Sequence, residues 1–165
     1  MRRFAQETAA ADYSWARPNR RYAAQGLFIP SLHSQQVGHF VIAVDTSGSI
    51  DKVAYDQFMG DVNAIVDDVK PSRVTVICCD RKIHGDPEVF EQGEHVDVEP
   101  LGGGGTDLRP PFEAVEDMGD DPAALIYFTD LDGITPDDAP EYPVLWACTG
   151  QGKEAPFGEL VELDT

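Results

Sequence analysis

The chain has 165 residues, of which 42% are hydrophobic, which is enough for one domain with a buried core and excludes a wholly disordered protein. Its formal net charge of −18 argues against nucleic acid as a partner, because the phosphate backbone is itself negative. No apolar run approaches the roughly 20 residues of a membrane span. Arg2 and Arg3 are not followed by the apolar core of a secretion signal. We therefore expect a cytoplasmic protein with no membrane partner.

The charge divides the chain at residue 37. Residues 1–37 carry five arginines against two acidic residues, a formal charge of +3, whereas residues 38–165 carry seven basic and 28 acidic residues, a formal charge of −21. This division predicts a basic and aromatic arm over 1–37, with a short helix before Asp12, and a single domain over 38–165. The arm could fold back on the acidic domain or bind a partner. Its interleaved aromatic and arginine residues can indicate binding of single-stranded nucleic acid, but beside an acidic domain they favour packing on the domain surface.

Apolar runs alternate with helical periodicities along the domain. The runs that predict buried strands are 40–44, 74–79, 124–128 and 144–148. The segments that predict helices are 51–70 and 110–118, while 81–98 suits a hairpin or edge strand and 157–163 a last strand. This alternation predicts an α/β fold with a central, mostly parallel sheet, one antiparallel edge strand and helices on both faces.

The first predicted strand ends in a cluster of short, oxygen-bearing side chains: Asp45, Ser47 and Ser49. Alternate residues of a tight turn can direct such side chains to one point. Carboxylate and hydroxyl oxygens suit a small hard cation such as Mg²⁺ or Mn²⁺, with Ca²⁺ as a further candidate. A simpler interpretation is that Ser47 or Ser49 caps the following helix. Two later segments favour the metal site.

The first of these is a run of four glycines, 102–105, followed by Thr106 and Asp107; the second is Thr129-Asp130 at the end of a predicted strand. No Gly-Lys-Ser/Thr follows the glycines, which excludes a nucleotide-binding P-loop. Ligands of open α/β sheets gather at the carboxyl ends of the strands. The residues that we predict to surround one cation are Asp45, Ser47, Ser49, Thr106 and Asp130. The acids that we expect to support the site from nearby are Asp80, Asp107 and Asp132.

Asp-Thr-Ser-Gly-Ser at 45–49, Gly-Gly-Thr-Asp at 104–107 and Thr-Asp at 129–130 together resemble the metal-ion-dependent adhesion site (MIDAS) of von Willebrand factor A (VWA) domains. The resemblance covers most of the domain and implies a Rossmann-like, three-layer fold. It also implies that Ser47, Ser49 and Thr106 contact Mg²⁺ and that Asp45 and Asp130 hold it largely through water. A Glu or Asp of a partner protein would complete the coordination.

The arm contains Asp-Tyr-Ser-Trp at 12–15, Pro-Asn-Arg-Arg-Tyr at 18–22 and Pro-Ser-Leu at 30–32. These motifs are similar to those of an uncharacterised bacterial branch in which a VWA-like domain follows a region that resembles a metallopeptidase. This resemblance implies a non-catalytic adaptor in a larger bacterial assembly, with a MoxR-type AAA+ ATPase as a candidate partner. The chain itself contains no His-Glu-x-x-His, so it lacks the usual ligands of a zinc hydrolase.

The main alternative is enzymatic. Residues 125–135 resemble the nucleophile loop of haloacid dehalogenase-type phosphatases, in which Asp130 would attack phosphorus and Asp132 would act as acid and base. That family places this loop on its first strand, with a lysine and an acid pair much later, whereas Lys153 is the sole lysine after Asp132. A second alternative is a structural domain with a vestigial metal site.

Overall fold

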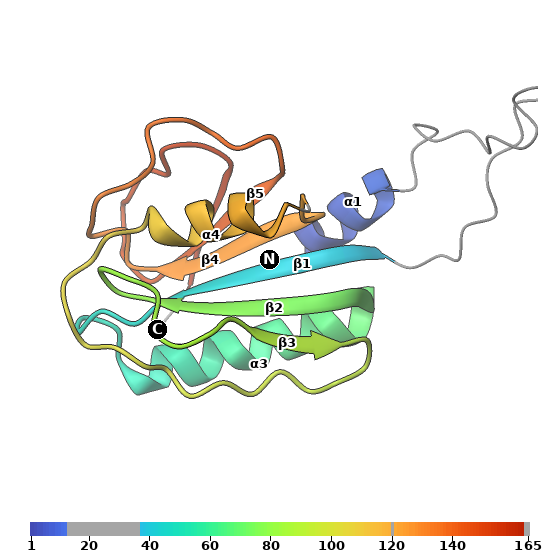
Figure 1. Ribbon diagram of the computed structural model, residues 1–165, viewed down its shortest axis with the longest axis horizontal. Coiled ribbons are helices and arrows are strands. Elements are labelled where there is room, and N and C mark those ends of the chain that lie inside the picture. Colours follow the sequence, from blue (N-terminus) through green and yellow to red (C-terminus); the bar gives the residue numbers. More distant parts are fainter. Residues whose placement is uncertain (13–36, 120, 164–165) are drawn as a thin grey trace, which may run out of the picture.

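The computed structural model describes residues 1–12, 37–119 and 121–163. In this part of the chain, six strands form one sheet with the order β3-β2-β1-β4-β5-β6 (Figure 1). The strands are β1 (Val37–Asp45), β2 (Pro71–Cys79), β3 (Glu88–Glu91), β4 (Ala124–Thr129), β5 (Val144–Cys148) and β6 (Glu159–Glu162). Strand β3 runs antiparallel to β2, and the other neighbouring pairs are parallel. The predicted mostly parallel sheet with one antiparallel edge strand is confirmed.

Helices cover both faces of the sheet (Figure 1). Helices α1 (Arg2–Asp12) and α3 (Lys52–Val69) pack on one face, and α4 (Pro110–Met118) packs on the other. Successive side chains of a strand point to opposite faces, so β1 contributes Ile42 to the core beneath α3 and Val41 to the core beneath α4. This arrangement confirms the predicted three-layer α/β fold. None of the helices described here is long and apolar enough to cross a membrane.

Aromatic side chains fix β4 between its neighbours. On one face, Phe58 of α3 stacks on Phe128 of β4, with ring centroids 4.4 Å apart. On the other face, Tyr127 of β4 stacks on Trp146 of β5 at 5.1 Å. The indole N–H of Trp146 donates to the carbonyl of Phe157 at 2.8 Å, so the polar end of this buried ring is paired. The carboxyl end of β4 is therefore anchored by packing on both faces.

Helix α1 packs against the acidic domain. Phe4 and Ala5 are buried in the same core as the apolar face of α3. Arg2 also forms an ion pair with Asp68 of α3, at 3.0 Å. The described part of the basic arm thus lies on the domain, whereas its aromatic and arginine-rich run lies outside the described residues.

The order of the strands reverses at β1. The chain leaves β1 through α3 to β2 on one side and returns through β3 and α4 to β4 on the other side. In open α/β sheets, the loops diverge at such a reversal, and ligands bind at the carboxyl ends of the two strands that flank it. Here these strands are β1, which ends at Asp45, and β4, which ends at Thr129.

Candidate functional site

Asp45 lies at the centre of this edge and is fully buried. Its Oδ1 accepts a hydrogen bond from the backbone N–H of Ser47 at 2.9 Å, and its Oδ2 accepts one from the hydroxyl of Thr129 at 2.7 Å. The second bond joins the ends of β1 and β4. Burial raises the pKa of Asp45 above its ordinary value, although both hydrogen bonds oppose this, and the negative charge of nearby Asp130 raises it further.

Ser47 and Ser49 place their hydroxyl oxygens 3.1 Å apart. Neither residue caps the helix that follows. That position belongs to Asp51, whose carboxylate accepts a hydrogen bond from the N–H of Ala54 at 2.7 Å. The capping interpretation of the two serines is therefore wrong. The Ser47 hydroxyl lies beside Asp45, and the Ser49 hydroxyl lies beside that of Ser47.

The cap itself gives a first prediction. We expect Asp51→Ala to lower the free energy of unfolding by about 1 kcal/mol. The Ala54 N–H in the first turn of α3, which has no partner within the helix, then loses its acceptor. Urea denaturation followed by circular dichroism would measure the change. Asp67→Ala, at an exposed position of the same helix, is the control. An equal loss in both variants would contradict a specific capping role.

Thr106 and Asp130 lie on the loops that surround this cluster. Asp130 follows β4 and is close enough to Asp45 for its charge to affect the pKa there. Thr106 packs against Gly133, where an added Cβ would lie 2.6 Å from the threonine Cγ2. Asp130 therefore lies near Asp45, and Thr106 lies against the loop that follows Asp130. No hydrogen bond between described residues joins Thr106 directly to Asp45.

The loop that carries Thr106 is held by Asp80, the residue after β2. The Oδ2 atom of Asp80 accepts a hydrogen bond from the N–H of Gly104 at 3.1 Å. The backbone carbonyl of Asp80 accepts one from the N–H of Asp107 at 2.7 Å. A single residue therefore fixes the loop on both sides of Thr106.

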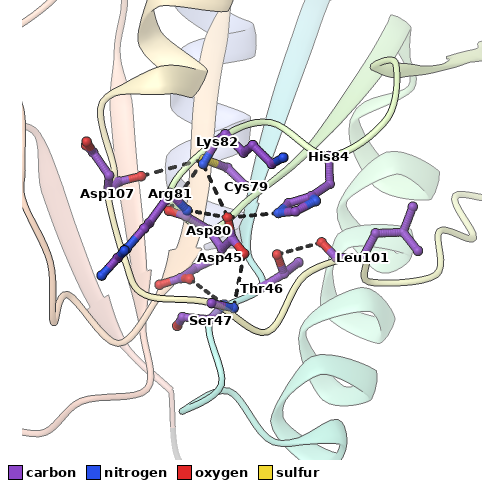
Figure 2. A network of polar contacts seen from close by, with 11 residues as sticks. Asp45, Thr46, Ser47, Cys79, Asp80, Arg81, Lys82, His84, Leu101 and Asp107 are labelled. Carbon is purple, nitrogen blue, oxygen red and sulfur yellow. Dashed lines mark hydrogen bonds and ion pairs between the residues drawn. The ribbon is translucent and has the colours of Figure 1, made fainter.

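The other carboxylate oxygen of Asp80 is equally well paired (Figure 2). It accepts hydrogen bonds from the backbone N–H groups of Arg81 and, at 3.2 Å, of Lys82, and it lies 2.8 Å from Nε2 of His84. Burial by itself would raise the pKa of Asp80. The hydrogen bonds outweigh burial and lower this pKa to about 2. Asp80 is therefore ionised in the folded protein throughout the physiological range.

The glycines of the loop are required by close packing. An added Cβ at three of them would collide with side chains at the ends of β1 and β2. The colliding pairs are Gly102 with Thr46 Oγ1, Gly104 with Asp80 Oδ2 and Gly105 with Arg81 Nε, the last two at 2.7 Å. Gly103 in addition has a φ of 125°, which side chains disfavour. The run therefore lets the loop approach the ends of the two strands.

Asp107 and Asp132, the other two acids expected near the site, have different partners. Arg109 donates to both carboxylate oxygens of Asp107, at 2.9 and 2.7 Å, and these bonds lower the pKa of that carboxyl group. The Nζ atom of Lys153 lies 3.1 Å from Asp132. In the described ranges, no three His, Cys, Asp or Glu side chains gather in a way that could hold a metal ion. A cation at this edge would therefore depend on hydroxyl oxygens.

Two threonines of the quoted motifs, Thr46 and Thr129, form hydrogen bonds at the site that the sequence pattern does not predict. Thr129 supplies the hydrogen bond between β4 and Asp45, and Thr46 Oγ1 donates to the carbonyl of Leu101 at 2.8 Å. Both are buried hydroxyls at strand ends. Their position directly at the end of an apolar run is the signal that could have indicated these roles.

Comparison with known proteins agrees with this architecture. A family model described as a VWA-like domain (DUF2201) matches residues 40–164. An uncharacterized protein of Thermotoga maritima is 29% identical over 100 residues, which are 61% of this chain and 24% of that protein. The chain thus spans about a quarter of the length of this relative. No solved structure matches the chain. Because the family model covers more than half of the sequence, the chain belongs to the family of VWA-like domains (DUF2201).

Proposed function

We propose that the chain is a Mg²⁺-dependent protein-binding module without catalytic activity. The residues that would hold the ion, directly or through water, are Asp45, Ser47, Ser49, Thr106 and Asp130. The observation that carries the proposal is the distance of 3.1 Å between the Oγ atoms of Ser47 and Ser49. Adjacent ligands of an octahedral Mg²⁺ lie about 3.0 Å apart, because each bond is about 2.1 Å long.

The charges at the site support the same proposal. Asp45 is buried, and the negative charge of nearby Asp130 further disfavours its ionised form. A divalent cation would offset this repulsion. Since the hydroxyls of Ser47, Ser49 and Thr106 are neutral, the ion would keep its affinity for an anion. A Glu or Asp side chain of another protein is the ligand that this arrangement would favour.

Exposed apolar side chains favour a protein over a small anion as the partner. The most exposed large hydrophobic residues of the described ranges are Val53, Val89, Leu101 and Ile134, between 53% and 72% exposed. Three of them lie around the candidate site: Val53 in the first turn of α3, Leu101 before the glycine loop and Ile134 after β4. Apolar side chains around a polar centre are typical of protein interfaces. An adaptor role beside a MoxR-type AAA+ ATPase stays a hypothesis from the resemblance.

The phosphatase alternative is not favoured. Asp132, its acid and base, is exposed and paired with Lys153. Asp130 follows the fourth strand in chain order rather than the first. This alternative also leaves the pair Ser47 and Ser49 without a role. Hydrolysis of p-nitrophenyl phosphate that is lost in Asp130→Asn but kept in Ser47→Ala would restore it.

The proposal is tested by calorimetric titration of Mg²⁺ and Mn²⁺. We expect one saturable site in the wild-type protein and none in Ser49→Ala, because the variant lacks a hydroxyl ligand at an exposed position where the fold tolerates the change. Ser72→Ala, in β2 near the opposite edge of the sheet, should bind as the wild type does. Unchanged binding in Ser49→Ala would contradict the proposed site. If the wild-type protein binds neither Mg²⁺ nor Mn²⁺, the alternative of a structural domain with a vestigial metal site would be favoured.

A further inference from the structure

The basic residues of the acidic domain are concentrated at the edge of the sheet that carries the candidate site. Residues 38–165 contain seven of them. Five lie just after the carboxyl ends of strands or at the starts of the helices there: Lys52, Arg81, Lys82, Arg109 and Lys153. The other two, Lys70 and Arg73, lie where α3 ends and β2 begins, at the opposite edge. This edge therefore carries most of the basic residues of a domain whose formal charge is −21.

Three of these five cations are already neutralised. They form ion pairs in the combinations Lys52 with Asp56 at 3.0 Å, Arg109 with Asp107 at 2.7 Å, and Lys153 with Asp132 at 3.1 Å. Arg81 and Lys82 are exposed and form no ion pair with any residue that the structure describes. Their side chains are therefore available to a negatively charged partner.

Arg81 is the better placed of the two. A Cβ at Gly105 would lie 2.7 Å from Nε and 2.9 Å from Nη2 of Arg81, so the guanidinium packs on the backbone of the residue before Thr106. Figure 2 shows the side chain of Arg81 extending away from Asp80, in the direction opposite to that of Lys82. Glycine at 105 thus leaves space for a planar cation beside a proposed metal ligand.

We propose that Arg81 binds a second carboxylate of the partner, next to the one that the metal ion would bind. This inference rests on the proposed function. The guanidinium presents paired N–H donors that match the two oxygens of a carboxylate. The occupant is therefore a segment of a partner protein with two acidic side chains close together. The remaining acidic surface would repel such a segment, which restricts its binding to this edge.

The test uses synthetic Gly-Ser peptides that contain either one Asp or two Asp at increasing spacing, titrated into the ¹⁵N-labelled protein with Mg²⁺ or with EDTA. With Mg²⁺, the best two-Asp peptide should bind about two- to fivefold more tightly than the one-Asp peptide, as expected for an exposed charge pair. Arg81→Gln should remove this advantage and leave the one-Asp peptide unchanged. Lys70→Gln, which removes the same charge at the opposite edge, should change neither affinity.

The two possible failures are distinguishable. If the one-Asp peptide binds equally well in EDTA, the metal-dependent function is wrong. If Arg81→Gln keeps the advantage of the two-Asp peptide, or if neither peptide binds, the assignment of Arg81 is overturned. Calorimetry of Arg81→Gln should show the same affinity for Mg²⁺ as the wild type, because the substitution removes a contact with the peptide and not with the ion.

Discussion

Asp45→Asn is expected to weaken Mg²⁺ binding strongly and to make the metal-free protein more stable. The carboxylate of Asp45 is fully buried, and burial raises its pKa. The folded state therefore holds the Asp45 proton more tightly than the unfolded chain does. The fold is destabilised as the pH rises above the unfolded-state pKa, and the full loss is present above the folded pKa. Asparagine carries no charge and can keep both bonds, by accepting from the Ser47 N–H and donating to the Thr129 hydroxyl. We expect a gain of roughly 1 kcal/mol at pH 7.

Two measurements check this expectation. Urea denaturation in EDTA at pH 7 should show the variant to be more stable than the wild type, and the difference should shrink below about pH 4, where an unfolded-state Asp is protonated. Calorimetry should show that the affinity for Mg²⁺ falls roughly 100-fold or more, since groups that merely support metal ligands are worth roughly 10- to 100-fold. Asp67→Asn, exposed on α3, is the control. A variant less stable than the wild type in EDTA would contradict the argument from burial.

Asp80→Ala should have the opposite effect on stability. Its carboxylate pairs the N–H groups of Arg81, Lys82 and Gly104, and the substitution leaves them without that acceptor. We expect the free energy of unfolding to fall by roughly 2 to 3 kcal/mol. The affinity for Mg²⁺ should also fall, because the loop that carries Thr106 loses its anchor.

The pH dependence identifies the carboxylate as the cause. Since the pKa of Asp80 is lowered to about 2, its contribution to stability is complete above the ordinary Asp value near 3.9 and is lost as the pH falls toward 2. The difference between wild type and Asp80→Ala should therefore diminish over this range. Hydrogen exchange of the Gly104 amide should accelerate in Asp80→Ala. It should not accelerate in Asp86→Ala, which removes an exposed acid from the loop between β2 and β3 that also contains Asp80. Equal exchange in the two variants would refute the anchoring role.

The sequence predicts the elements of this fold where side chains carry the signal. The predicted segment 110–118 coincides with α4, because a pair of prolines marks its start. The predicted segment 144–148 coincides with β5, because all of its residues are apolar and buried. Strand β2, by contrast, begins at Pro71 rather than at residue 74. Its first residues are partly polar, and they belong to the sheet through backbone pairing, in which Pro71 lies opposite Val37. Hydrophobic patterns contain no information about such pairing.

The candidate site shows the same limit. Asp45, Ser47, Ser49 and Asp130 could be placed at one edge because each follows a buried strand. The anchoring of the glycine loop could not be predicted, since Asp80 accepts a backbone N–H of Gly104, 24 residues away, and any residue could donate such a bond. The cap of α3 was within reach: an aspartate directly before the helical pattern is itself a capping signal, but the two serines were equally plausible.

The hydrogen bond between Asp45 and Thr129 joins positions 84 residues apart in the chain. A site built across such a separation exists only when β1 and β4 have paired, so a bound ion would favour the native state over partly folded states that lack this pairing. At a free ion concentration 100 times the dissociation constant, this selection would add about 2.7 kcal/mol to the stability of the protein. The concentration of free divalent metal would then affect both the resistance of the chain to proteolysis and the fraction of the chain that can bind a partner protein.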